Sequence, residues 1–383
     1  MRLGIENVAL TSFGLLKKRR VGLLSHQAAL LKNGATSAQY LHQARGVNLV
    51  ALYGPEHGFF GQASAGEQTA SRLHPDWNIP VYSLYGEFRK PTPDMLNGIE
   101  VMVCDLQDLG VRCYTYLATL RNVLEACAES KIPVIIADRP IPLPEVVDGP
   151  MLDEHFSSFV APCPLPLVYG MTPGEVAQWM VRKFALPLSL TVIPMEGWCR
   201  KDVAWGASYP DWVPPSPGIK SWETAMTYSS TVFSEALPGI DCGRGTNLAF
   251  RVVGAPWIRA EHACQALKQI KLPGVTFNPY RYVAGTVPYR DCELDGIRLC
   301  VTNPATFKPV KTSVMLLDTL ASLYGKKRVW KHDGVRPEWF DKLYGTSATR
   351  QALLASQASE HVRQWTSSSR AFLKERQNVL IYR

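Results

Sequence analysis

The feature that most limits the fold of this chain is an alternation of short apolar runs with helical patterns over its first 200 residues. Amphipathic stretches, the clearest at residues 115–129 and 172–184, lie between the runs. The apolar runs are VGLLS at 21–25, NLVALYG at 48–54, VMVCDL at 101–106 and VIIAD at 134–138. Continuous apolar strands separated by helices are typical of a parallel sheet that helices cover on both faces. The pattern therefore predicts a Rossmann-like, doubly wound α/β fold.

The second part of the chain has a different pattern. Residues 197–220 are rich in Trp, Pro and Gly and show no period, which predicts a long loop at a domain junction ending near residue 225. Beyond it, the strand patterns LAFRVVG and GIRLCVT alternate with helical patterns, and the last fifty residues are mostly helical. We predict a Rossmann-like domain over residues 1–225 and a smaller α+β domain over residues 226–383.

The composition excludes several classes of protein. Hydrophobic residues make up 46% and charged residues 19% of the chain, and the mean hydropathy is −0.06, which are ordinary values for a globular protein. No apolar run approaches the roughly 20 residues that cross a bilayer. The net charge is +8, but the only dense basic run is at 17–20. We therefore expect no nucleic-acid or membrane partner, and the basic average suits an anionic small substrate.

The cysteines and the N-terminal sequence predict a cytoplasmic location. The nine cysteines are scattered without CxxC pairs, and an odd number of them fits a reducing compartment better than a disulfide framework. The basic cluster near the N-terminus follows the apolar residues, which is the reverse of the order in a signal peptide. The sequence does not indicate the oligomeric state.

Polar side chains follow the predicted strands, at the edge of the sheet where doubly wound folds bind their ligands. Ser25 and His26 follow the first strand, and the stretch YGPEHGFFGQASAGE includes the end of the second. In that stretch Glu56 and His57 lie between glycines, which allow tight bends and a close approach of a ligand, and Glu67 ends it. The structural alternative is a capping glutamate beside a histidine bonded to the backbone.

A second cluster, in the stretch CDLQDLGVRCYTYLATL, gathers polar and aromatic side chains at one strand-to-helix junction. Carboxylates and amides bind sugar hydroxyls, tyrosines cover the apolar face of a sugar ring, and an arginine pairs with a carboxylate through two hydrogen bonds. The alternative is a capped helix with an internal Asp–Arg pair. The candidate residues of this cluster are Asp105, Gln107, Asp108, Arg112, Tyr114 and Tyr116.

Two further loops carry charged residues. In the stretch ADRPIPLPEVVDGPMLD, Asp138 and Arg139 form either a structural pair or part of a site, and Asp148 is a further carboxylate. In DCGRGTN, Arg244 lies between two glycines, which is typical of an anion-binding glycine loop but also of a simple turn. Arg139 and Arg244 are thus candidate contacts for an acidic ligand.

The common cofactor motifs are absent from the sequence. No GxGxxG follows the first strand, and there is no P-loop, no HExxH helix and no GxSxG elbow. We therefore expect no cofactor and no metal. One alternative stays open, in which His26, His57 and an aspartate converge on a metal ion.

Several motifs together resemble one known family. The chain contains GLLSHQAA, YGPEHGFFG with AGE, YSLYG with KPTPDML, DLQDLGVRCYTY, DRP with DGPMLD, YGMTPGE, and GRGT with GAPW, in the order seen in the NamZ-type exo-β-N-acetylmuramidases. The resemblance covers most of residues 15–310. It implies hydrolysis of the β-glycosidic bond of an N-acetylmuramic acid at the non-reducing end of peptidoglycan-derived fragments. The substrate would be a muramic-acid-containing disaccharide or muropeptide from cell-wall turnover and recycling.

The resemblance also suggests which residues carry the reaction. Glycoside hydrolysis normally uses one carboxylic acid to protonate the leaving oxygen and a second carboxylate as base or nucleophile. We expect Glu56 to be the acid. Candidates for the second group are Asp105, Glu67, Asp148 and Glu235, of which Asp148 and Glu235 join Glu56 in the predicted catalytic set; assistance by the substrate's own acetamide is a further alternative. A cation should bind the lactyl carboxylate of muramic acid, with Arg112, Arg139 and Arg244 as candidates.

Two other classes of function stay open. A metal-dependent amidase acting on wall peptides would need His26 and His57 to share a metal ion. A non-catalytic muropeptide-binding protein would hold the sugar without turnover, and the stretch SEALPGI, where many relatives resemble FEGTN, keeps that alternative open. The predicted substrate-binding residues are Ser25, His26, His57, Glu67, Asp105, Gln107, Asp108, Arg112, Tyr114, Tyr116, Arg139 and Arg244.

Overall fold

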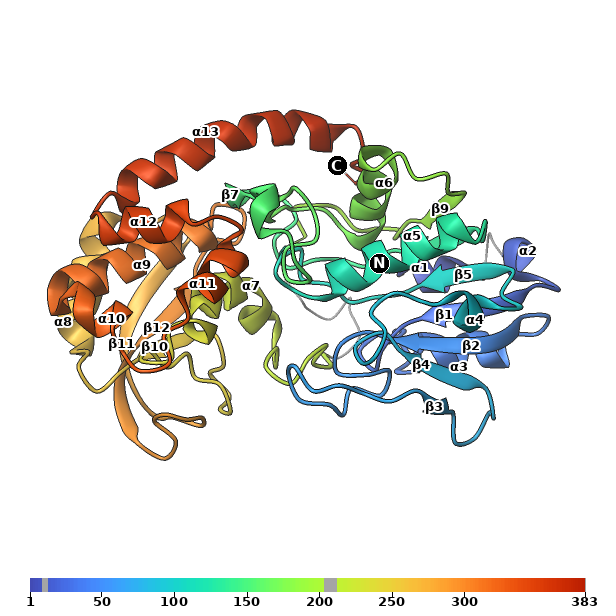
Figure 1. The fold of residues 1–383 in the computed structure, drawn as a ribbon, viewed down its shortest axis with the longest axis horizontal. Coiled ribbons are helices and arrows are strands. Elements are labelled where there is room, and N and C mark those ends of the chain that lie inside the picture. Colours follow the sequence, from blue (N-terminus) through green and yellow to red (C-terminus); the bar gives the residue numbers. More distant parts are fainter. Residues whose placement is uncertain (9–12, 203–211, 383) are drawn as a thin grey trace.

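The protein forms two lobes of unequal architecture, seen side by side in Figure 1. The structure is a computed structural model that describes residues 1–8, 13–202 and 212–382. The first half of the chain builds the lobe with the large sheet, and the second half builds a lobe rich in helices. None of the helices formed by the described residues combines the length and the apolar character needed to cross a bilayer.

A seven-stranded sheet is the centre of the N-terminal lobe. Its strands pair in parallel, apart from a short antiparallel strand at one edge. In spatial order they are β3 (Arg72–Leu73), β4 (Pro80–Ser83), β2 (Asn48–Gly54), β1 (Arg20–Leu24), β5 (Val101–Cys104), β6 (Val134–Ala137) and β9 (Leu190–Ile193). Because β1 pairs with both β2 and β5, the strand order reverses direction at β1. The predicted Rossmann-like sheet is confirmed, and each of the four predicted apolar runs forms one of its strands.

The helices of this lobe begin where the sequence supplies caps. Thr172 accepts a hydrogen bond from the Glu175 backbone, and the Glu175 carboxylate accepts one from the Thr172 backbone, so that a capping box and Pro173 start α6 (Pro173–Lys183). α5 (Tyr116–Glu129) buries the apolar face that its sequence predicts. The other helices are α1 (Gly4–Asn7), α2 (Phe13–Leu16), α3 (Ser37–Gln43) and α4 (Pro93–Leu96).

A connecting region leads from the sheet to the second lobe. It holds the hairpin of β7 (Asp148–Met151) and β8 (Pro166–Val168), with the 3-10 helix η2 (Glu154–Phe156) between the two strands. The predicted long loop at residues 197–220 is described only in part, since residues 203–211 lie outside the described residues. Its described parts form no helix and no named strand, as predicted.

The C-terminal lobe packs helices on a three-stranded antiparallel sheet. The sheet has the order β10 (Val252–Gly254), β12 (Glu293–Val301) and β11 (Val275–Val283). The helices are α7 (Trp222–Thr231), η3 (Val232–Glu235), α8 (Ala260–Ile270), α9 (Pro309–Tyr324), α10 (Lys326–Trp330), α11 (Pro337–Tyr344), α12 (Ala348–Leu354) and α13 (Ala358–Gln377). The predicted α+β class and the helical end of the chain are confirmed. One hydrophobic cluster runs from the large sheet into this lobe, so the two lobes share a core.

The end of the chain returns to the N-terminal lobe and binds there. Figure 1 shows α13 arching over both lobes, with the C-terminus beside α6. The Tyr382 hydroxyl donates to Asp138 Oδ2 at 2.7 Å and accepts from the Met195 N–H at 2.9 Å. The Ile381 N–H donates to Glu175 Oε1 at 2.9 Å. We call this contact of residues 376–382 with the N-terminal lobe the C-terminal clasp.

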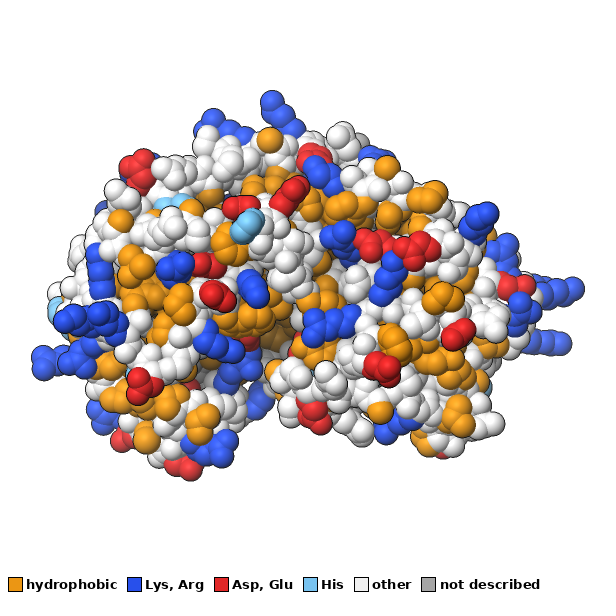
Figure 2. Space-filling model, in the orientation of Figure 1, with side chains coloured by type: hydrophobic (Ala, Val, Ile, Leu, Met, Phe, Trp, Pro, Cys, Tyr) orange, Lys and Arg blue, Asp and Glu red, His pale blue; other side chains and the backbone are white. Residues whose placement is uncertain are grey.

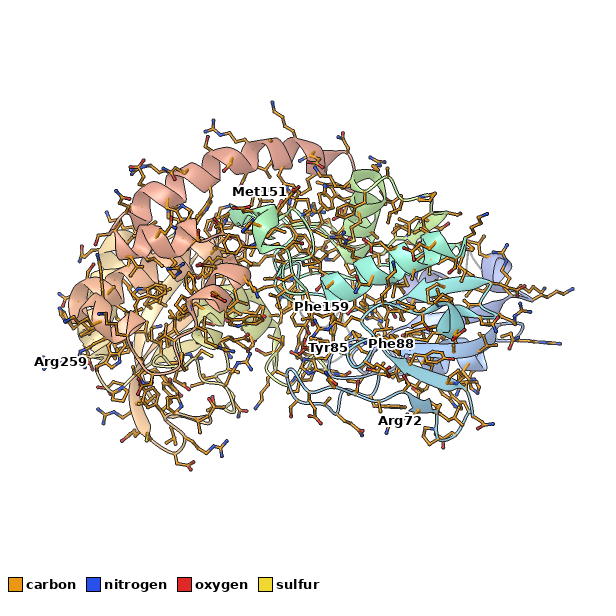
Figure 3. The ribbon with its side chains drawn as sticks, in the orientation of Figure 1. Arg72, Tyr85, Phe88, Met151, Phe159 and Arg259 are labelled. Carbon is orange, nitrogen blue, oxygen red and sulfur yellow. The ribbon has the colours of Figure 1, made fainter. Side chains whose placement is uncertain are left out.

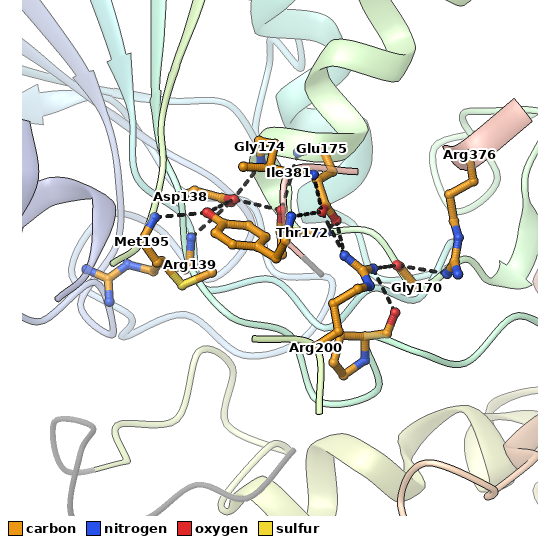
Figure 4. A network of polar contacts seen from close by, with 12 residues as sticks. Asp138, Arg139, Gly170, Thr172, Gly174, Glu175, Met195, Arg200, Arg376 and Ile381 are labelled. Carbon is orange, nitrogen blue, oxygen red and sulfur yellow. Dashed lines mark hydrogen bonds and ion pairs between the residues drawn. The ribbon is translucent and has the colours of Figure 1, made fainter. Parts of the chain in front are cut away.

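Two arginines complete the clasp, as Figure 4 shows. Arg200 pairs with Glu175 at 2.7 Å, and Arg376 donates to the Gly170 carbonyl at 3.0 Å. Burial and the negative charge of neighbouring Glu175 together raise the pKa of Asp138 to about 7. The carboxylates of Asp138 and Glu175 are both buried, and each accepts hydrogen bonds from the N-terminal lobe and from the end of the chain.

We expect Tyr382→Phe to lower the free energy of unfolding by about 1–3 kcal/mol, because it removes one donor from Asp138 and leaves the buried Met195 N–H without its acceptor. Urea denaturation followed by circular dichroism measures the change. Tyr280→Phe, which alters an exposed tyrosine of β11, is the matched control. Equal stability of the two variants would show that the clasp contributes little.

Candidate active site

A cavity of about 950 Å³ lies between the two lobes. Figure 2 shows this part of the surface as a hollow bordered by several Lys and Arg side chains. The volume falls in the range of ligand sites and is large for a single small molecule. From the N-terminal lobe and the connecting region it is lined by Glu56, His57, Tyr85, Tyr114, Thr115, Ser216 and Lys220, and from the C-terminal lobe by Tyr228, Glu235, Asp241, Arg244, Arg336 and Trp339, among others.

Glu56 follows β2 directly and points into this cavity. Its turn depends on Gly54, where a β-carbon would lie 2.3 Å from the Phe59 nitrogen. The Gly66 N–H donates to Glu56 Oε1 at 2.8 Å, and the Thr115 hydroxyl donates to Oε2 at 2.6 Å. The side chain is thus held from two sides while it lines the cavity.

Glu235 is the second glutamate of the cavity and comes from the other lobe. It ends η3, and its side chain is 24% exposed and pairs with Arg244. Burial raises the pKa of Glu235; the positive charge of Arg244 opposes this shift, and the negative charge of Glu56 adds to it. The two carboxylates therefore line one cavity, and the negative charge of Glu56 disfavours the ionised form of Glu235.

Three cationic side chains line the cavity, and two of them contact Glu235. Arg244 lies between Gly243 and Gly245, whose φ angles of 73° and 78° place both in the left-handed region. Its guanidinium also lies 4.8 Å from the centre of the Phe250 ring. Arg336 donates to the backbone carbonyl of Glu235, and Lys220 completes the group. The cavity can therefore bind an anionic ligand.

Aromatic side chains form part of the wall. Burial raises the pKa of the Tyr85 phenol, and the negative charge of Glu56 also raises it. Tyr114 packs edge-on against Tyr228 with ring centres 6.0 Å apart, and both line the cavity. Such rings suit the apolar face of a sugar. Tyr85 lies in the YSLYG motif, whereas no sequence signal pointed to Arg336 or Trp339.

Several predicted ligand contacts lie instead in a buried network behind the cavity. The Gln107 N–H donates to His26 Nε2 at 2.9 Å, and Arg139 donates to Asp105 Oδ2 at 2.9 Å. The Ser25 hydroxyl bonds to that of Ser37 at 2.9 Å. None of these side chains lines the cavity among the described residues. Arg139 therefore has a structural role and no substrate contact, but its carboxylate partner is Asp105 and not the Asp138 that the sequence suggested.

The histidines do not form a metal site in the described parts of the chain. Burial lowers the pKa of His26 well below its ordinary value, and the charge of Arg139 lowers it further. The ring is therefore neutral near pH 7. Within residues 1–8, 13–202 and 212–382 no group of three His, Cys, Asp or Glu side chains is placed to hold a metal ion. The amidase alternative, which needs His26 and His57 to share a metal, has no support in this geometry.

Other predicted contacts bond to the protein itself. Arg112 is fully buried and donates to the carbonyls of Pro150 at 3.1 Å and Tyr344 at 2.5 Å, so it cannot reach a substrate carboxylate. The Tyr116 hydroxyl donates to the Pro215 carbonyl at 2.5 Å. Neither Arg112 nor Tyr116 lines the cavity.

Two of the carboxylates that we predicted for the site, Asp148 and Glu67, do not line this cavity. Asp148 is buried and accepts hydrogen bonds from the backbone N–H groups of Val310 at 2.8 Å and Lys311 at 3.0 Å, so it caps the start of α9. This structural role replaces the catalytic role that we predicted for Asp148. Glu67 accepts the Ser64 N–H at 2.8 Å and lines a separate, smaller cavity of about 320 Å³.

Two carboxylates that line one cavity are an arrangement that glycoside hydrolases use. Family models for the N-terminal and C-terminal parts of "Exo-beta-N-acetylmuramidase NamZ" match residues 21–223 and 226–382. The chain therefore belongs to the NamZ family of exo-β-N-acetylmuramidases. The resemblance predicted from the motifs, and with it the glycosidase class, is confirmed.

Similar proteins come from two organisms. The chain is 34% identical over 369 residues to the "Peptidoglycan beta-N-acetylmuramidase NamZ" of Bacillus subtilis (strain 168). This match covers 96% of this chain and 88% of that protein. A crystal structure of a DUF1343 family protein from Bacteroides fragilis NCTC 9343 has a TM-score of 0.92 and 31% identity, and covers 100% of this chain and 99% of that one. A second such protein from the same organism has a TM-score of 0.78 and 26% identity, with the same coverage.

Asp108 provides a test of the buried network. Its carboxylate accepts a hydrogen bond from the Tyr169 hydroxyl at 2.7 Å, and burial raises its pKa from 3.8 to about 6. The folded protein therefore keeps this proton up to about pH 6, whereas the unfolded chain loses it near pH 3.8. The contribution of Asp108 to stability is complete below the unfolded pKa and is lost as the pH rises through the folded pKa.

Asparagine does not titrate. As the pH rises from 4 to 6, we therefore expect the free energy of unfolding to fall less in Asp108→Asn than in the wild type, and the difference between the two falls should be about 3 kcal/mol at most. Urea denaturation at several pH values measures the two slopes. Asp291→Asn, at an exposed position, should keep the wild-type slope. If Asp108→Asn also kept it, Asp108 would not hold its proton in the folded state.

Proposed function

We propose that this protein releases N-acetylmuramic acid from the non-reducing end of peptidoglycan-derived fragments, with Glu56 and Glu235 as the catalytic pair. The observation that carries the proposal is that these two glutamates, one from each lobe, line the same cavity and interact electrostatically. The third acidic residue of the lining, Asp241, accepts hydrogen bonds from the Gly243 N–H at 2.7 Å and the Tyr282 hydroxyl at 2.6 Å, which explains it as a structural group.

Their surroundings favour a division of roles that differs from the sequence-based expectation. Glu56, which we expected to be the acid, accepts a hydrogen bond on each carboxylate oxygen, from the Gly66 N–H and from the Thr115 hydroxyl. Burial and the charge of Glu56 raise the pKa of Glu235. Glu235 therefore protonates the glycosidic oxygen as the bond to the sugar breaks, and Glu56 serves as base toward water or as nucleophile at the sugar carbon.

Recognition of muramic acid requires a cation for its lactyl carboxylate. Of the three arginines predicted for this role, only Arg244 lines the cavity, and Arg336 and Lys220 lie in the same lining. Arg244 already pairs with Glu235, so Arg336 is the better candidate for a substrate contact. An interaction of this kind distinguishes muramic acid from N-acetylglucosamine, which lacks the lactyl group.

We place this activity in the cytoplasm, in the recycling of imported wall fragments. All nine cysteines are free thiols, and most of them are buried as small core residues. Free thiols of this kind fit a reducing compartment. The partner of the protein in this setting is a small carbohydrate, a muramic-acid-containing disaccharide or muropeptide.

We expect Glu56→Gln and Glu235→Gln each to lower kcat about 100- to 10,000-fold on a disaccharide of N-acetylmuramic acid β-linked to N-acetylglucosamine. Release of N-acetylmuramic acid is measured by chromatography. Glu360→Gln, at an exposed position of α13, is the matched control and should turn over normally. Binding of the disaccharide without turnover by the wild type would instead indicate a muropeptide-binding protein.

The same variants separate the acid from its partner. An aryl glycoside with a good leaving group needs no proton, so Glu235→Gln should retain far more activity on it than Glu56→Gln. Higher activity of Glu56→Gln than of Glu235→Gln on the aryl glycoside would instead identify Glu56 as the acid.

For substrate choice, we expect Arg336→Ala to lower the ratio of kcat/KM between the muramide and the matching N-acetylglucosaminide about tenfold, because a charge-assisted hydrogen bond is lost only with the muramide. Arg328→Ala, at an exposed position of α10, is the control. An equal loss on both substrates would show that Arg336 does not recognise the lactyl group.

A further inference from the structure

A cation lies against two aromatic rings, one of which, Tyr85, lines the cavity. The Arg89 guanidinium carbon is 4.5 Å from the centre of the Phe159 ring and 5.3 Å from that of Tyr85. The two rings are 5.7 Å apart. Figure 3 shows Tyr85 and Phe159 close together on the side of the N-terminal lobe that faces the other lobe. Contacts with two rings hold the otherwise mobile arginine side chain in one place.

Arg89 differs from its basic neighbours in having no acidic partner. Lys90 pairs with Glu129 at 2.6 Å, and Arg121 pairs with Glu125 at 2.7 Å. For Arg89, no carboxylate of the described residues comes within ion-pair distance, and the side chain is exposed. A guanidinium that is fixed in position and lacks a partner is prepared to bind a carboxylate from outside, with little loss of side-chain freedom.

The position of Arg89 relative to the catalytic pair indicates which part of a substrate would reach it. Tyr85 lines the cavity together with Glu56, and its ring centre lies 5.3 Å from the Arg89 guanidinium carbon. Val160, next to Phe159 in the chain, lines the cavity. An exo-acting enzyme takes the terminal sugar into the enclosed part of its site, and the rest of the chain leaves by the mouth. Arg89 is exposed and, unlike Tyr85, is not among the described residues that line the cavity, so a group that it binds would lie outside the enclosed part.

We propose that Arg89, Phe159 and Tyr85 form a subsite for the leaving-group part of the substrate, in which Phe159 packs on a sugar ring and Arg89 binds a carboxylate. The carboxylate belongs to the next muramic acid along the glycan strand, either as the free lactyl group or at the end of an attached peptide. This subsite makes the enzyme prefer strands that continue beyond the disaccharide. The proposal rests on the proposed function, because it assigns a place to the aglycone of that reaction.

Four substrates test the proposal. They are the disaccharide of N-acetylmuramic acid and N-acetylglucosamine, the trisaccharide that adds a second N-acetylmuramic acid, the same trisaccharide with that lactyl carboxylate methylated, and the trisaccharide carrying a peptide there. Arg89→Ala should lower the ratio of kcat/KM between the free trisaccharide and the disaccharide about fivefold, as expected for a solvent-exposed ion pair. Arg89→Lys should restore part of the ratio, since it keeps the charge.

The methyl ester and the peptide separate the sources of the carboxylate. With the wild type, a preference for the free acid over the ester assigns the lactyl group, and a preference for the peptide-bearing trisaccharide assigns the peptide. Arg72→Ala is the matched control, because Arg72 is also an exposed arginine, stacked on Phe60 at 4.4 Å beside the smaller cavity. It should leave the ratio unchanged.

Two results would overturn the proposal. One is an equal loss on all four substrates by Arg89→Ala together with a lower melting temperature, because a purely structural cation–π contact acts in that way. The other is an unchanged ratio in a variant that folds normally. Failure of the wild type to hydrolyse even the disaccharide would count against the proposed function, whereas normal hydrolysis of the disaccharide with no effect of Arg89 would reject the subsite alone.

Discussion

Buried hydrogen bonds around Glu175 and Asp138 hold the two lobes in one orientation, and the site depends on that orientation. Glu56 follows a strand of the large sheet, whereas Glu235 ends a short helix of the other lobe. A small rotation between the lobes would separate the two carboxylates. The C-terminal clasp opposes such a rotation because it bonds the end of the chain, Ile381 and Tyr382, to carboxylates that lie deep in the first lobe.

A doubly wound sheet offers a ligand crevice where its strand order reverses, yet here the protein fills that crevice with its own side chains. The Asp105–Arg139 pair and the His26–Gln107 bond occupy the carboxyl ends of the central strands. With the crevice closed, the nearest free space lies further out, between the loops of the sheet and the second lobe. Glu56 reaches this space because it belongs to the loop after β2, next to the centre of the sheet.

The sequence predicted the fold well because apolar runs and caps act locally. It was less accurate where tertiary contacts decide: the run LAFRVVG was predicted as one strand, but β10 begins only at Val252, since Phe250 has a left-handed φ of 60° and bonds back to Cys242. In the candidate site, motifs drew attention to Glu56 and Arg244. They also drew attention to Arg112 and Asp148, which bond to the protein's own backbone. The sequence alone does not distinguish a charged side chain of this kind from one that contacts a ligand.

The charges of the cavity fit the proposed division of roles. Its lining carries Glu56, Glu235 and Asp241 against Lys220, Arg244 and Arg336, so the formal charges cancel when every acid is ionised. Glu235 must be protonated to act as the acid, and the cavity then carries one positive charge in excess. A single carboxylate on the substrate balances that charge. The protonation state needed for bond cleavage is thus also the state that best accommodates an acidic amino sugar.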